Sequence, residues 1–266
     1  MPNWVTNKLT INGENKKDFI LSLMTKDNDE EYFDFEKIIP MPKELRIDKS
    51  SYNDVAMKLY LAKINPLILN FGNDKMYVNE FKQLIHLLFK NDTKKEMYYV
   101  INSNELEKIL LMYEEKFKDK FDDEIVKLIE IGEKLINNVK KYNYPTWYEW
   151  SYANWGVKWN SNNTYYNLDD GIIYFDTAWC PSVEVIKELA KQHPEYDFIH
   201  EYAEEQIAFY TGKLEYENGE CIDNIEYEAY SKEAYELYFE LWGCEEDFIY
   251  DESKGTYIEK NEEEME

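Results

Sequence analysis

Carboxylates concentrated in the last quarter of the chain are the side chains with the clearest chemistry. Residues 201–266 contain 22 Asp and Glu against 4 Lys, a net charge of −18 out of −25 for the 266-residue chain. Carboxylates on ordered structure attract basic proteins and can take the place of nucleic-acid phosphates. We predict that eight of them, interleaved with apolar residues, bind a partner: Glu226, Glu228, Glu233, Glu236, Glu240, Glu245, Glu246 and Asp247.

A second group of candidates lies in a tryptophan-rich stretch, residues 147–182, which holds five of the seven tryptophans. Aromatic rings beside a lysine can stack the bases of a nucleotide. A ligand pocket is therefore an alternative prediction, formed by Trp150, Trp155, Lys158, Trp159 and Asp176. The competing interpretation is structural, because dense aromatics are typical of a packed seam and a carboxylate such as that of Asp176 is typical of a cap or turn.

No motif indicates a reaction. The chain lacks the glycine patterns of phosphate-binding loops, dinucleotide-binding folds and serine hydrolases. His200 begins the segment HEYAEE, but the HExxH zinc motif requires a second histidine where Glu204 stands. The three cysteines lie far apart in the sequence, and no two of them have the short spacing of a metal-ligand pair: Cys180, Cys221 and Cys244. We therefore predict no catalytic residue, no metal and no cofactor.

The composition and N-terminus indicate where the protein works. The negative charge disfavours direct binding to nucleic acid or to an anionic membrane. The first residues show no basic region followed by an apolar core, and no apolar run reaches 18 residues. We expect a cytoplasmic protein whose partner is a basic host protein.

Periodicity predicts an α+β fold. The order of elements is strand, helix, strand, helical insert, hairpin, helix, strand and strand, which is a split βαβ arrangement with antiparallel additions. The predicted segments are strands at 4–11, 33–39, 165–168, 172–177, 196–203 and 207–211, helices from Asn15 and Pro181, helical periodicity between Asp54 and Tyr142, a strand near Ile222 and a helix ending at Trp242.

These elements divide the chain into three parts. A sheet core comprises residues 1–45 and 144–220, a helical subdomain at 46–143 is inserted into it, and residues 221–266 form an acidic extension with a strand, a helix and a tail. After Cys244 the extension is expected to be loosely attached.

Four separate blocks of residues resemble a known family. They are Pro2-Asn3-Trp4 with Asn7 and Leu9, the segment FDFEKIIPMP at 33–42, Trp147-Tyr148 with Asn154-Trp155-Gly156 and Lys158-Trp159-Asn160, and Phe175-Asp176-Thr177-Ala178-Trp179 with Pro181. In this order they resemble the YubB-type ferredoxin-like family of phage and plasmid proteins. The resemblance implies a ferredoxin-like α+β core and an origin on mobile genetic elements, and it implies no reaction.

Two function classes follow from these observations. The first is a phage or mobile-element protein that inhibits a host nucleic-acid-targeting defence system, of the anti-CRISPR or anti-restriction type, by binding it through the acidic surface. The second is a small-ligand protein, such as a binder of a signalling nucleotide, that uses the tryptophan pocket. An acidic interaction module without a role in defence is a further alternative, and an enzyme ranks last.

Overall fold

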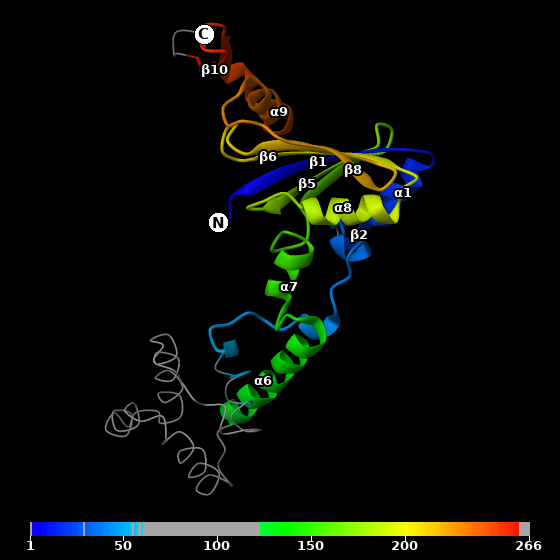
Figure 1. The fold of residues 1–266 in the computed structure, drawn as a ribbon, viewed down its shortest axis with the longest axis vertical. Helices are drawn as coiled ribbons and strands as arrows, with labels where there is room; N and C mark the ends of the chain where they lie inside the picture. The colour runs from blue at the N-terminus through cyan, green and yellow to red at the C-terminus, as the bar shows by residue number, and fades with distance from the viewer. Residues whose placement is uncertain (1, 29, 55, 58–59, 61–122, 261–266) are drawn as a thin grey trace, which may run out of the picture. The chain divides into compact units, whose positions relative to one another are not determined.

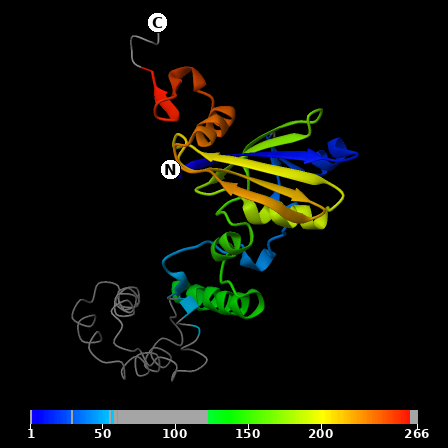
Figure 2. The same ribbon diagram turned by 45° about the horizontal axis from the view of Figure 1, so that its top comes forward.

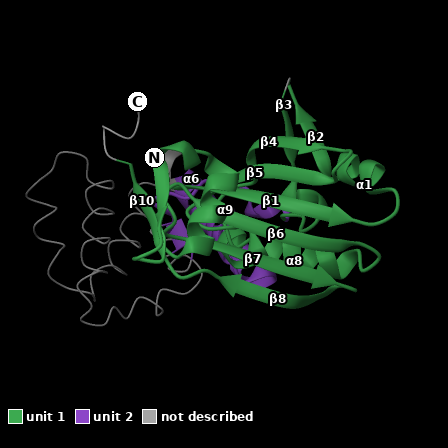
Figure 3. Cartoon of the chain, turned by 90° about the horizontal axis from the view of Figure 1, so that it is seen from above, with its two compact units in different colours: residues 1–41, 150–266 green, residues 42–149 purple. Residues whose placement is uncertain are grey.

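The computed structural model describes residues 2–28, 30–54, 56–57, 60 and 123–260. The chain forms two compact units, residues 1–41 with 150–266 and residues 42–149, shown in different colours in Figure 3. Most of the helical pattern expected between Asp54 and Tyr142 lies outside the described residues.

Unit 1 is built on a six-stranded antiparallel sheet. Its strands are β1 (Trp4–Asn12), β4 (Asn162–Asn167), β5 (Ile172–Ala178), β6 (Asp197–Glu204), β7 (Thr211–Glu217) and β8 (Glu220–Glu226). They are arranged in the order β4-β5-β1-β6-β7-β8, and each is antiparallel to its neighbours.

The chain order through this sheet gives a ferredoxin-like fold, as predicted. β5 and β6 flank β1 and are both antiparallel to it, so they are parallel to each other and α8 (Val183–Gln192) connects them. The earlier half-motif runs from β1 through α1 (Lys16–Leu23) to β4. Between α1 and β4 the chain carries a small hairpin and unit 2.

Alternation along the strands sorts side chains to the two faces of the sheet. On β1, Leu9 and Ile11 are fully buried on the face covered by α1 and α8, and Phe198 lies opposite Ile11 on that face. Lys8 points to the other face, where α9 (Lys232–Trp242) packs. Figures 1 and 2 show α8 and α9 on opposite sides of the sheet.

Two strand predictions are wrong. Residues 33–39 are not a single strand: β2 (Met24–Asp27) pairs with β3 (Glu30–Phe33), and η1 (Phe35–Lys37) follows. Phe33 and Phe35 mimic strand alternation because both rings are buried and pack against Phe175, at centroid distances of 5.0 and 5.9 Å.

The strand predicted at 207–211 begins later. Residues 205–210 form a turn, and the paired strand β7 starts at Thr211. Ala208 explains the shift, because it is fully buried and has a left-handed φ of 47°, which a strand does not accommodate.

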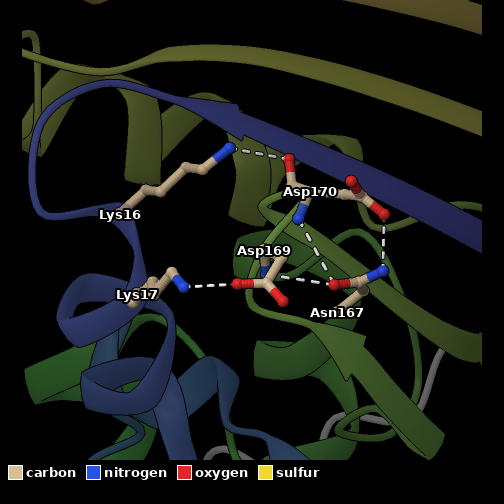
Figure 4. Close-up of polar contacts among 5 residues, drawn as sticks. All are labelled: Lys16, Lys17, Asn167, Asp169 and Asp170. Atoms are coloured by element: carbon tan, nitrogen blue, oxygen red, sulfur yellow. Dashed lines mark hydrogen bonds and ion pairs between the residues drawn. The ribbon is translucent and has the colours of Figure 1, made fainter.

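The turn between β4 and β5 is tied to α1 (Figure 4). Gly171 has a φ of 81°, and a Cβ there would lie 2.6 Å from the backbone oxygen of Ile11, so the position requires glycine. Lys16 donates to the backbone oxygen of Asp170 at 2.8 Å, and Lys17 pairs with Asp169, which lowers the pKa of that carboxyl. These contacts position the edge strand; they do not form a site.

Unit 2 is described in part. It contains η2 (Lys43–Leu45) and α6 (Asp123–Tyr142), and α7 (Trp147–Asn154) begins in it. The buried Asn138 joins these pieces, because its side-chain amide donates to the backbone oxygens of Glu44 at 2.8 Å and Pro145 at 3.0 Å.

Residues 245–260 form regular structure, contrary to the expectation of a loosely attached extension after Cys244. η4 (Glu245–Asp247) is followed by a hairpin of β9 (Phe248–Asp251) and β10 (Thr256–Glu259). Phe248 and Tyr257 pack against the aromatic residues of α9, and this burial holds the hairpin in place.

Candidate functional site

The acidic surface is organised by helix α9. Ser231 caps its N-terminus, with the side-chain oxygen accepting from the backbone N–H of Ala234 at 3.2 Å. The helix is amphipathic, and its buried side comprises Ala234, Tyr235, Leu237, Tyr238 and Phe239. Four of these residues form an aromatic core with Ala203 of β6 and Ala208, on the sheet face opposite α8: Ala234, Tyr235, Tyr238 and Phe239. α9 is therefore fixed to the sheet.

The eight predicted carboxylates all have exposed side chains. Glu233, Glu236 and Glu240 lie on the outward side of α9, at spacings of three and four residues. Glu226 ends β8, Glu228 follows it, and the remaining three form η4. The fold thus brings residues 226–247 into one ordered segment, with the acids outside.

Two of the eight carboxylates are engaged in ion pairs. Glu236 lies 3.5 Å from Lys232 on the same helix, and Glu240 lies 2.5 Å from Lys8 of β1. Lys8 also pairs with Glu201 at 2.8 Å. Burial lowers the pKa of Lys8, but hydrogen bonds and charge from Glu201 and Glu240 outweigh burial and hold this pKa above its ordinary value. Within the described residues, the other six acids have no ion pair.

The predicted tryptophan pocket is divided by the fold. Trp150 and Trp155 are core residues, 6% and 3% exposed, and their rings meet edge to face at 5.4 Å. The indole N–H of Trp155 donates to the backbone oxygen of Ile39 at 2.9 Å. Both rings therefore pack in the core of unit 1 and do not line an open pocket.

Lys158 and Trp159 lie instead at the surface, beside a residue that the predicted pocket did not include. The rings of Trp159 and Trp179 are 40% and 42% exposed, with centroids 5.4 Å apart and planes 35° from each other. The Lys158 ammonium lies 4.2 Å from the Trp159 centroid and 5.2 Å from that of Trp179. We call these three residues the tryptophan pair with its lysine.

Asp176 makes side-chain contacts across the sheet. Its carboxylate accepts from the Thr6 hydroxyl at 2.9 Å and from the Asn163 amide at 2.8 Å. Thr6 is its partner in the β1–β5 register, so the contact joins neighbouring strands. Asp176 therefore binds side chains of two neighbouring strands rather than the helix-end N–H groups that a cap would satisfy.

A buried polar network lies on the other face of the sheet. Asn7 donates to the Thr177 hydroxyl at 2.8 Å and to the backbone oxygen of Val5, so its side-chain oxygen is left to accept from Nε2 of His200 at 2.9 Å. His200 is fully buried, and burial lowers its pKa to about 3. Asn7 therefore sets the neutral tautomer of His200, with the proton on Nε2.

The described part of the chain shows no group of three or more His, Cys, Asp or Glu residues arranged to hold a metal ion. Burial raises the pKa of Cys180, whose thiol contacts the backbone oxygen of Gly156 at 3.1 Å, so this thiol is protonated at neutral pH. Among the described residues, no helix combines the length and apolar character that crossing a bilayer requires.

These features define a ferredoxin-like α+β protein with an acidic helix on its sheet. Residues 154–245 match the family model for the ferredoxin-like domain in Api92-like protein. Among solved structures, the chain is similar to the crystal structure of a protein Api92 from Yersinia pseudotuberculosis, with 16% identity, a TM-score of 0.38, and coverage of 86% of this chain and 99% of that chain. A search of curated proteins gives no match.

Proposed function

We propose that this protein binds a basic protein partner through the acidic surface made by α9, η4 and the end of β8. The observation that supports it is the orientation of α9, whose aromatic side is buried on the sheet. Glu233 and Glu236 face outward, and Glu240 is half exposed beside its ion pair with Lys8. Because the helix is anchored, its carboxylates are held in a fixed array before a partner arrives. Such preorganisation reduces the conformational entropy lost on binding.

The charge of this region favours a cationic partner. Residues 220–260 contain 13 Asp and Glu and 3 Lys, a net charge of −10. Fields of this kind raise association rates by roughly 10- to 10³-fold and weaken steeply with salt. They also repel one another within the protein, so the acids oppose folding unless a partner or counterions neutralise them.

We propose that the partner is a nucleic-acid-binding protein and that the carboxylates occupy the place of phosphates. Along α9 the outward acids recur every three or four residues, about 4.5–6 Å of helix rise. This spacing is closer to the rise of about 3.4 Å per phosphate in one strand than to the 1.7 Å per charge of a duplex. We therefore propose that the array takes the place of the phosphates of one strand.

The YubB-type resemblance adds a biological setting to this proposal. Proteins of phages and plasmids meet host defence complexes that bind DNA or RNA in basic channels. We propose that the partner is such a complex and that binding inhibits it.

The test is competition in capture experiments from host lysate. The protein should retain a basic, nucleic-acid-binding protein at about 50 mM salt, release it at high salt, and lose it to added single-stranded DNA. A variant with Glu233, Glu245, Glu246 and Asp247 changed to Lys should lose capture. A matched variant reverses four exposed acids elsewhere on unit 1, Glu14, Asp18, Glu195 and Asp197. Equal capture by the two variants would contradict the proposed surface.

A further inference from the structure

The tryptophan pair presents two large rings to solvent from separate segments of unit 1. Trp159 follows α7, and Trp179 lies between β5 and α8. Exposed tryptophans that touch each other mark binding surfaces, because indole supplies apolar area and an electron-rich face with few rotatable bonds.

The backbone of Trp179 adds an independent reason to regard the ring as functional. Its φ is 67°, in the left-handed region where a bulky side chain is strained. The conformation is fixed by a hydrogen bond from the Trp179 N–H to the backbone oxygen of Asn3 at 2.8 Å, and by the Thr177 hydroxyl, which donates to the backbone oxygen of Cys180 at 2.8 Å. Glycine would fit this turn without strain, so a tryptophan here places an indole at the surface at a conformational cost.

The position of Lys158 shows that the two indole rings attract a cation. Its ammonium lies within 6 Å of both centroids, the range over which an aromatic face attracts a cation. The rings are too close to enclose a planar ligand, since a ring or base between them needs roughly 7 Å, twice the carbon contact distance of about 3.5 Å, and their centroids are 5.4 Å apart. A ligand must therefore stack on an outward face.

The surroundings select the charge of that ligand. Trp179 and Glu205 flank the start of β1, because the N–H of Trp179 binds Asn3 and the N–H of Glu205 binds the backbone oxygen of Trp4. They are thus about two strand spacings, or roughly 10 Å, apart. Glu205 is exposed. The Glu205 carboxylate and the net charge of −25 favour a cation on the rings over a phosphate, which they would repel.

We propose that the tryptophan pair binds an arginine guanidinium of an extended basic segment, with Glu205 pairing a second basic residue. A guanidinium is planar and weakly hydrated, and it stacks on indole better than an ammonium does. Three residues of extended chain span about 10 Å, which is similar to the separation of the Trp179 and Glu205 backbones across β1. Lys158 occupies the same rings and competes with the arginine. This inference rests on the proposed function only for the basic character of the partner.

Because Lys158 competes for the rings, the proposal predicts in which direction its removal changes the affinity for the peptide. Indole N–H signals of ¹⁵N-labelled full-length protein are followed while a nine-residue peptide with Arg at every third position and Gly elsewhere is added. The signals of Trp159 and Trp179, assigned with the Phe variants, should shift. Trp159→Ala and Trp179→Gly should each weaken binding by about 2- to 25-fold. Lys158→Met should strengthen it, because the competing cation is gone.

Comparison ligands and variants separate guanidinium stacking from phosphate binding and from unspecific attraction between charges. The peptide with Lys in place of Arg should bind more weakly, and AMP should not shift either signal. Tyr165→Ala, which removes a ring that is 59% exposed on another strand, should leave the Arg peptide bound equally well. Weaker peptide binding by Lys158→Met, or tighter binding of AMP than of the peptide, would overturn the proposal in favour of a phosphate ligand.

Two further measurements separate guanidinium binding at the tryptophan pair from effects on folding and from binding at the acidic surface. Trp179→Gly should melt within a few degrees of the parent, because relief of backbone strain offsets the lost ring contacts; a fall of more than about 8 °C would assign the ring a structural role instead. The α9–η4 charge-reversal variant should still show the peptide-induced shifts. If lysate capture fails while these shifts persist, the proposed function fails and the guanidinium site stands; loss of the shifts in the parent protein overturns the site.

Discussion

Lys8 on the central strand forms an ion pair with Glu240 on the C-terminal helix, at 2.5 Å and across 232 residues of sequence. The same ammonium is 2.8 Å from Glu201 on the neighbouring strand. Lys8 is 12% exposed and Glu201 17%, whereas Glu240 is 49% exposed. One lysine therefore neutralises an inner and an outer carboxylate where α9 meets the sheet.

Removing Lys8 should be costly because it leaves an unpaired carboxylate in a largely buried position. We expect Lys8→Met to lower the free energy of unfolding by about 2–4 kcal/mol, measured by urea denaturation at pH 7. Glu240→Gln should cost less than about 1 kcal/mol, since its carboxylate is half exposed and screened by water. Changing Glu201 to Leu in the Lys8→Met background should recover most of the loss. Equal losses for Lys8→Met and Glu240→Gln would show that burial does not govern this network.

His200 should make unit 1 sensitive to acid. Its folded pKa of about 3 lies below the ordinary 6.5, so between these values the unfolded chain binds a proton that the folded protein does not. The contribution of His200 to the free energy of unfolding is therefore fully present above pH 6.5. It is lost as the pH drops toward 3, by up to about 1.4 kcal/mol per pH unit.

His200→Gln, which keeps a side-chain donor for Asn7, should reduce this slope by about one proton in urea unfolding series from pH 7 to 4. His193→Gln is the matched control, because the His193 side chain is 36% exposed, and the change in slope should be larger for the buried His200. A slope unchanged by His200→Gln would mean that other groups control the acid response.

The buried and exposed tryptophans should differ sharply in their effect on stability. Trp155→Ala removes a ring that is 3% exposed and leaves the backbone oxygen of Ile39 without its donor, so we expect a loss of about 3–5 kcal/mol. Trp159→Ala should cost less than about 1 kcal/mol, because its ring is 40% exposed. Thermal melts followed by circular dichroism would show the difference, and comparable melting temperatures would place Trp155 outside the core.

The cap of α9 links folding to the acidic surface. Ser231→Ala deletes the acceptor for the Ala234 N–H and should destabilise the protein by about 1 kcal/mol, while Ser231→Asp should retain stability. Hydrogen exchange of α9 amides should accelerate in the Ala variant alone. Unchanged exchange would show that the aromatic contacts beneath the helix suffice to hold it.

Periodic segments were predictable from the sequence because local pattern decides them. The hairpin around Gly171, the helix after Pro181 and the helix ending at Trp242 all appear where apolar spacing placed them. The segment 33–39 was misassigned because Phe33 and Phe35 share a buried side despite the break at Asp34, a tertiary effect that alternation cannot reveal.

The site was less accessible to sequence analysis than the fold. The acids of α9 could be named because they are spaced along one helix, but the ion pair of Glu240 with Lys8 depends on long-range packing. The sequence shows Trp179 only as one of many aromatic residues in the stretch 147–182. Its exposure follows from a left-handed backbone conformation, which the neighbouring residues do not predict. Trp150 and Trp155 are also tryptophans, yet they lie in the core, so the residue type alone does not separate core from surface.

The central position of β1 also bears on how the chain folds during synthesis. β1 pairs with β5 and β6, so contacts such as that from Thr6 to Asp176 span 170 residues. At translation rates of about 5–20 residues per second, β1 waits roughly 10–35 s for its first partner strand. During that interval its apolar residues have no sheet to join, and we expect the nascent chain to depend on chaperones or on early folding of the intervening segment.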